Sequence, residues 1–209
     1  MFLTSKSHMY SKYVVRWATQ YLEEYWSAIE NEQSTSVVVE RAVSWLPSRA
    51  NWFKINIDGA VFASQNAAGL GVIIKDDRER VEAAMSKKVF VPLGVLEAEA
   101  KAFEASLLLA KDIGIQDVIL EGGSLVIYCA LCEASLPPSS IALVVLGMMD
   151  LCKEFRWIEF SHVRRKGNRP AHLLAKYVVG IGDFLVWMEE NPCFLSKLFH
   201  MMYPLDFSE

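Results

Sequence analysis

The chain has 209 residues, a formal net charge of -4 and 53% hydrophobic residues. This length suits one domain with extensions, and the negative charge excludes nucleic-acid binding through a positive field over the whole surface, so any such contact needs a local basic patch. The sequence has no run of roughly 18 apolar residues, as a membrane span needs, and no apolar secretory signal at its start. These features predict a globular intracellular protein, nuclear or cytoplasmic, with no membrane partner.

Residues 1–51 are predicted to form an N-terminal amphipathic helix and a linker. Apolar residues recur at helical spacing across residues 10–29, whereas residues 31–51 are mostly polar and contain Pro47. Three basic residues precede the first acid, Glu23, as in an organelle transit peptide. A soluble helix is the favoured interpretation of this segment.

Residues 52–179 are predicted to form the main domain, with strands and helices in the order βββαβααβα. The predicted strands cover residues 53–58, 70–75, 81–89, 117–121 and 157–162, and the predicted helices cover residues 96–113, 124–133, 140–155 and 170–179. Asp58 ends the first strand on its polar face. Three consecutive strands followed by alternating helices and strands are typical of a mixed sheet with helices on both faces. Residues 180–209 are rich in aromatic residues and are predicted to be a docked tail.

Five local motifs occur on these predicted elements in chain order. They are WFKINIDGA (52–60), GLGVIIKD (69–76), EAEAKA (97–102), VILEGGS (118–124) and HVRRKGNRPAHLLAK (162–176). In this order they resemble the plant reverse-transcriptase-like ribonuclease H family, which occurs in non-LTR retrotransposon polyproteins and their freestanding derivatives. The resemblance implies a ribonuclease H-like α/β fold with a five-stranded mixed sheet, in which three antiparallel strands are followed by two parallel additions.

The resemblance also implies a catalytic site for cleaving the RNA strand of an RNA–DNA hybrid with two Mg²⁺ ions and four carboxylates, the oxygen ligands that this hard cation prefers. Asp58 and Glu99 match two of the four metal ligands. At the other two ligand positions the family has Asp, whereas this chain has Gly123 at one and His172 at the other. Glycine offers no side-chain ligand and histidine suits softer metals, so the two-ion site is expected to be impaired.

Other interpretations of these residues remain open. An Asp after a strand is often only a turn residue. The assignment of Asp58 as a metal ligand therefore depends on the other motif residues occurring with it. Glu97 lies two residues before Glu99 and therefore faces another side of the helix. Glu121 could replace a missing ligand, although a structural role is favoured because it lies two residues before Gly123. For His172, a polar helix position is favoured over a metal ligand.

The basic segment after the last predicted strand is the candidate nucleic-acid contact. The residues predicted to bind phosphates are Arg164, Arg165, Lys166, Asn168 and Arg169. Such contacts would position a duplex without reading its sequence. The alternative is a solvated basic loop.

We therefore predict a retrotransposon-derived, ribonuclease H-like protein that binds nucleic acid, such as an RNA–DNA hybrid, with little or no cleavage. One alternative is an active Mg²⁺-dependent hybrid endoribonuclease in which Glu121 or His172 substitutes for the missing ligands. Another is a protein-interaction module that uses the N-terminal helix and the aromatic tail. A decayed copy with no selected role is also compatible with the sequence.

Overall fold

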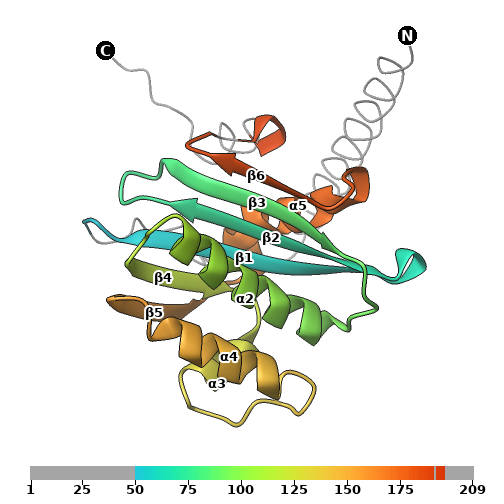
Figure 1. Ribbon diagram of the computed structural model, residues 1–209, viewed down its shortest axis with the longest axis horizontal. Coiled ribbons are helices and arrows are strands. Elements are labelled where there is room, and N and C mark those ends of the chain that lie inside the picture. The colour runs from blue at the N-terminus through green and yellow to red at the C-terminus, as the bar shows by residue number, and fades with distance from the viewer. Residues whose placement is uncertain (1–49, 191, 196–209) are drawn as a thin grey trace, which may run out of the picture. The chain divides into compact units, whose positions relative to one another are not determined.

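The computed structural model describes residues 50–190 and 192–195, built around a six-stranded mixed sheet in the order β5-β4-β1-β2-β3-β6 (Figure 1). The strands are β1 (Phe53–Phe62), β2 (Ala67–Lys75), β3 (Val81–Val89), β4 (Asp117–Gly122), β5 (Trp157–His162) and β6 (Phe184–Met188). The α-helices are α2 (Val95–Asp112), α3 (Leu125–Leu131), α4 (Ala142–Cys152) and α5 (Arg169–Tyr177). Short 3-10 turns are η1 (Ala63–Gln65), η2 (Arg165–Asn168) and η3 (Val178–Gly180).

The strand β1 lies in the interior of the sheet and joins its two halves. It pairs antiparallel with β2, which pairs antiparallel with β3. On its other side β1 pairs in parallel with β4, and β4 with β5. This arrangement confirms the predicted three antiparallel strands with two parallel additions.

The prediction of five strands is wrong by one, because β6 pairs antiparallel with β3 at the sheet edge. Its residues belong to the segment predicted as an aromatic tail. All five are apolar, so the alternation that marks a half-buried strand is missing. The ring of Trp187 packs edge-on against Tyr177, with 5.9 Å between centroids, and Phe194 stacks on Tyr177 at 4.2 Å. The predicted N-terminal helix, most of the linker and the tail beyond residue 195 lie outside the described residues.

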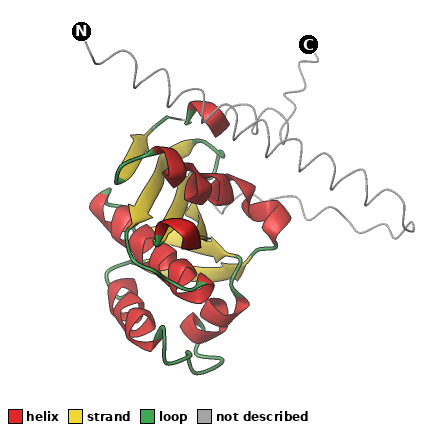
Figure 2. Cartoon of the chain, turned by 90° about the vertical axis from the view of Figure 1, so that its right-hand side faces the viewer, coloured by secondary structure: helices red, strands yellow, loops and turns green. Residues whose placement is uncertain are grey.

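The two faces of the sheet are covered by different helices. Ile55 and Ile57 alternate with polar residues along β1 and are fully buried in the main core, together with apolar side chains of α2, α3 and α4. Helix α5 packs against the opposite face of β1, β2 and β3. Figure 2 shows helices on both sides of the strands, as predicted. None of the described helices is long and apolar enough to cross a membrane.

A glycine in β2 lets α5 approach the sheet closely. A Cβ atom on Gly71 would lie 2.1 Å from the carbonyl oxygen of Ala171 and 2.3 Å from the backbone nitrogen of Ala175, so any larger residue would push the helix away. The buried hydroxyl of Ser86 on β3 donates a 2.8 Å hydrogen bond to the Leu174 carbonyl. These contacts place the first turn of α5 beside β1.

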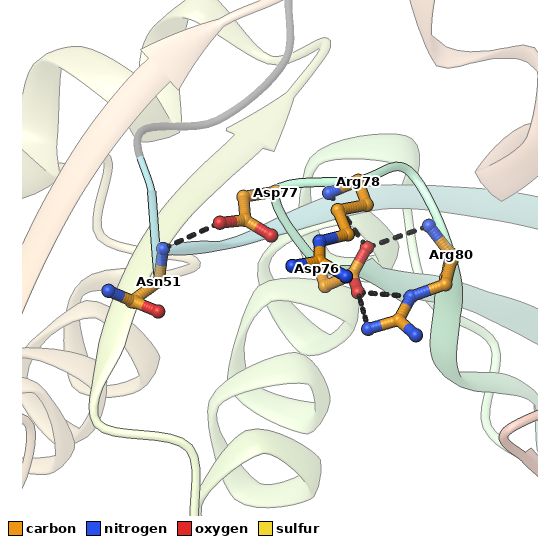
Figure 3. Close-up of polar contacts among 5 residues, drawn as sticks. All are labelled: Asn51, Asp76, Asp77, Arg78 and Arg80. Carbon is orange, nitrogen blue, oxygen red and sulfur yellow. Dashed lines mark hydrogen bonds and ion pairs between the residues drawn. The ribbon is translucent and has the colours of Figure 1, made fainter.

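The turn between β2 and β3 is organised by a buried carboxylate (Figure 3). The backbone N–H groups of Arg78 and Arg80 donate to Asp76 Oδ1 at 2.9 and 2.8 Å, and Arg80 Nε donates to Oδ2 at 2.7 Å. Burial opposes ionisation of Asp76, but the hydrogen bonds from Arg80 and Arg78 hold its pKa below the ordinary value. The Asn51 N–H donates to Asp77 Oδ2 at 2.8 Å and ties the start of β1 to this turn.

Candidate functional site

Asp58 and His172 are in direct contact. His172 Nδ1 lies 2.8 Å from Asp58 Oδ2, and the two side chains are mostly buried. The strand register pairs Asp58 with Gly71, which places the carboxylate on the sheet face covered by α5. The expectation that Asp58 ends its strand is wrong, because β1 continues to Phe62 through further pairing with β2. The carboxylate thus lies against the helix rather than in a turn.

The start of α5 is fixed to β1 by a second polar contact. Asn168 Nδ2 donates a 2.7 Å hydrogen bond to the Ile57 carbonyl, and Asn168 is only 2% exposed. Its Oδ1 atom is buried without a hydrogen-bond partner among the described residues. The structure therefore places Asn168 inside the domain, where it positions α5 and offers a nucleic acid little surface. Sequence reasoning missed this role, although the four-residue spacing of Asn168 and His172 is the helical spacing that puts two side chains on one face.

Glu99 reaches the same region from the other face of the sheet. A Cβ atom on Gly59 would lie 2.6 Å from the Glu99 nitrogen, so this glycine lets α2 approach β1 closely. Glu99 is partly buried, and its Oε2 atom is buried with no hydrogen-bond partner among the described residues. Burial, followed by the charge of Asp58, raises the pKa of Glu99 to about 8, although a hydrogen bond from the Gly59 backbone opposes the shift. At neutral pH the Glu99 carboxyl is therefore mostly protonated.

Gly123 leaves open space where the family pattern has a carboxylate. The parallel register ends with Ile57 paired to Gly122, the last residue of β4, so Asp58 and Gly123 are the residues that directly follow this pair. A Cβ atom on Gly123 would find only the Val163 carbonyl oxygen, at 4.0 Å, and Gly123 does not have the positive φ that resists substitution. The gap comes from the missing side chain and not from the backbone.

Glu121, the candidate replacement ligand, is held by two other residues. Its carboxylate lies 3.3 Å from Lys54 Nζ and accepts a 3.1 Å hydrogen bond from Asn56 Nδ2. Glu121 is 8% exposed, and Lys54 and Asn56 are likewise buried. This buried polar cluster has a structural explanation, because a carboxylate in a low-dielectric interior needs such partners.

The residues present do not fit a pair of magnesium ions. An oxygen of Asp58 is in contact with the imidazole of His172, and Gly123 supplies no side-chain ligand. Within residues 50–190 and 192–195, no three or more His, Cys, Asp or Glu side chains are grouped so as to hold a metal ion. The contact between Asp58 and His172 joins β1 to α5.

The basic segment borders the Gly123 position. His162 and Arg164 are exposed, and His162 Nε2 lies 3.2 Å from the Gly123 carbonyl oxygen. Arg169 is partly buried at the start of α5. The predicted phosphate contacts of Arg165 and Lys166 lie outside what the structure describes. Among the predicted contacts whose side chains the structure describes, Arg164 is the exposed cation near the candidate site.

The sheet order, the helices on its two faces and the cluster around Asp58 define a protein of the ribonuclease H-like fold. The chain belongs to the reverse transcriptase-like family, whose model matches residues 56–178.

Solved structures with the same fold are ribonucleases H and a reverse transcriptase. RNase H1 from the archaeon Halobacterium salinarum NRC-1 has 22% identity and a TM-score of 0.58, with 61% of this chain and 97% of that chain covered. LC11-RNase H1 in complex with RNA/DNA hybrid has 18% identity and a TM-score of 0.55, covering 59% and 94%. A foamy viral protease-reverse transcriptase in complex with RNA/DNA hybrid has 20% identity and a TM-score of 0.51, covering 68% of this chain and 22% of that one. These identities establish the fold alone. No curated protein matches the chain.

Proposed function

We propose that this chain is a ribonuclease H-like nucleic-acid-binding protein with little or no cleavage activity. The observation that carries the proposal is the 2.8 Å contact between His172 Nδ1 and Asp58 Oδ2. In this contact a nitrogen donor replaces the family carboxylate and occupies an oxygen that a bridging metal ligand needs free. The absent side chain at Gly123 supports the same conclusion.

The proposed ligand is an RNA–DNA hybrid. Two of the solved structures with this fold are described as complexes with RNA/DNA hybrid. The exposed Arg164 supplies a positive charge just after the end of β5, near Gly123. Backbone contacts of this kind recognise the shape of a duplex rather than its sequence. On the sequence resemblance, we also propose that the protein derives from a plant retrotransposon.

Binding and cleavage assays on the full chain test the proposal. We expect a fluorescent RNA–DNA hybrid to bind with an affinity that falls steeply with salt concentration, and to remain intact in Mg²⁺. An Asp58→Asn variant is the control for cleavage, and a DNA duplex of the same sequence is the control for hybrid preference. Absence of binding at low salt would exclude the proposed function. Cleavage that disappears in Asp58→Asn would support the active endoribonuclease instead.

A further inference from the structure

The outer edge of β6 has features of a docking site for another strand. Only β3 pairs with β6 among the described residues. The Asp183 carbonyl accepts a 2.6 Å hydrogen bond from the Lys88 N–H on the β3 side. At the other end of the strand, the Glu189 N–H donates to the Glu82 carbonyl at 2.8 Å. Antiparallel pairing alternates, so the odd-numbered residues direct their backbone groups toward β3.

The even-numbered residues Phe184, Val186 and Met188 therefore direct their N–H and C=O groups away from β3. These residues are 56%, 38% and 45% exposed, respectively. Edge strands usually carry a lysine, a proline or a bulge that prevents pairing with another chain. None of these features interrupts β6, whose sequence is FLVWM. This edge presents both hydrogen-bonding groups and apolar surface to a partner.

The charges at both ends of β6 indicate the chemistry of that partner. Asp183 precedes the strand, Glu189 and Glu190 follow it, and all three residues are exposed. We propose that β6 binds an extended peptide segment that is apolar in its centre and basic at both ends, and that this segment adds to the sheet as a further strand. Backbone hydrogen bonds would provide the affinity, and the flanking charges would provide the selectivity.

The same charges disfavour a second copy of this chain as the partner. Two antiparallel β6 strands related by a two-fold axis at Val186 would bring Asp183 of each copy close to Glu189 of the other, just beyond the ends of the paired strands. Like charges directly opposite in a sheet are destabilising. A basic partner removes this repulsion and gains two attractive pairs.

A peptide titration on the full-length protein tests this proposal. The probe is a fluorescent peptide of sequence KRVTVTVRK, and its matched control is EEVTVTVEE. A third peptide carries N-methyl groups on alternate central amides, which removes its hydrogen bonds but keeps its charge. We expect the basic peptide alone to bind, weakly and with salt dependence, because a single added strand buries a small interface. Equal binding of the basic and acidic peptides, or no binding, would overturn the proposal.

Two variants connect this binding to β6. Val186→Pro removes an outward N–H and leaves the hydrogen bonds to β3 in place, so it should weaken binding roughly five- to tenfold, whereas Val186→Thr should not. The double variant Asp183→Lys, Glu189→Lys keeps the strand intact and should reverse the preference toward the acidic peptide. Unchanged preference in this variant would overturn the proposal even if Val186→Pro disturbs folding. A dimer that sedimentation detects in the wild type and not in Val186→Pro would assign the edge to a second copy instead.

Discussion

His172 on α5 and Asp58 on β1 share a 2.8 Å contact between Nδ1 and Oδ2. In the family pattern both positions carry carboxylates that hold metal ions. In this protein the two side chains contact each other instead. The contact stabilises the fold, because the imidazole supplies a partner for the buried carboxylate.

The wild-type protein is expected to show no Mg²⁺-dependent hybrid cleavage above an Asp58→Asn control. Gly123 and His172 leave Asp58 and Glu99 as the remaining family ligands. The measurement is gel analysis of labelled RNA in a hybrid at several Mg²⁺ concentrations. Turnover in the wild type that Asp58→Asn abolishes would contradict this expectation.

The double variant Gly123→Asp, His172→Asp restores both missing carboxylates. It should bind Mg²⁺ more tightly than the wild type, whereas either change alone should have little effect. In the arrangement that the resemblance implies, Asp58 would contribute to both metal sites, Glu99 and position 123 to one of them, and position 172 to the other. Gly123→Asp should fold normally because a side chain there meets open space. His172→Asp alone should lower the melting temperature in the absence of Mg²⁺, since it places a second carboxylate beside Asp58.

Calorimetric Mg²⁺ titration of the wild type, the two single variants and the double variant checks this prediction. If the double variant binds Mg²⁺ no better than the wild type, Asp58 and Glu99 do not converge on a metal site.

Replacing Arg164, Arg165 and Lys166 together with Ala should weaken duplex binding for all sequences. Each lost phosphate contact should also reduce the dependence of affinity on salt. The measurement is anisotropy of a labelled hybrid across a salt series. A matched variant is Lys111→Ala, which removes a cation that pairs with Glu154 on the surface. An unchanged salt slope in the triple variant would mean that the loop is merely solvated.

Glu99 should make the stability of the protein fall as the pH rises. Its pKa in the folded state is about 8, above the ordinary 4.5, so unfolding releases a proton between these values. Stability is therefore fully present below pH 4.5 and is lost as the pH rises through about 8. The total effect should be a few kcal/mol at most, since one pKa unit corresponds to about 1.4 kcal/mol. Urea unfolding of the wild type and Glu99→Gln from pH 5 to 8.5 should show a steeper loss in the wild type, whereas Glu97→Gln should follow the wild type.

Asp76 should contribute to stability through the turn that it organises. Replacing it with Asn should lower the free energy of unfolding at neutral pH by roughly 1–3 kcal/mol, because the backbone N–H groups of Arg78 and Arg80 lose a charged acceptor. The pKa of Asp76 is lowered from 3.8, so this contribution is lost as the pH falls below that value. Unfolding curves at pH 7 and pH 3 measure the effect, with Asp112→Asn, a change at an exposed aspartate at the end of α2, as control. A pH-independent difference between Asp76→Asn and the wild type would contradict the explanation.

Much of the fold could be predicted from local patterns. The strands β3 and β5 begin and end at the predicted residues, and Ser124 caps α3 by accepting a hydrogen bond from the Ile127 N–H at 3.5 Å. Alternation and turn residues act over a few positions, so they are visible in the sequence. The strand β6 could not be predicted in this way, because it is apolar on both faces.

The site was predictable as a set of residues but not as a set of contacts. The motif order identified Asp58, Glu99, Gly123 and His172 as matching positions. The pairing of Asp58 with His172 depends on how closely α5 approaches β2 at Gly71, which is a property of tertiary packing. The raised pKa of Glu99 depends on burial, which the sequence does not display.

The contact between Asp58 and His172 spans 114 residues of sequence. During synthesis the β1–β2–β3 meander can emerge and pair long before α5 exists, because its contacts are local. The Asp58 carboxylate therefore has no contact with His172 until residue 172 has been synthesised and has left the ribosome. A chain truncated before residue 172 would contain β1, β2 and β3 but would lack the histidine that contacts Asp58. Helix α5 thus supplies the partner of Asp58 late in synthesis, before β6 adds to the sheet edge.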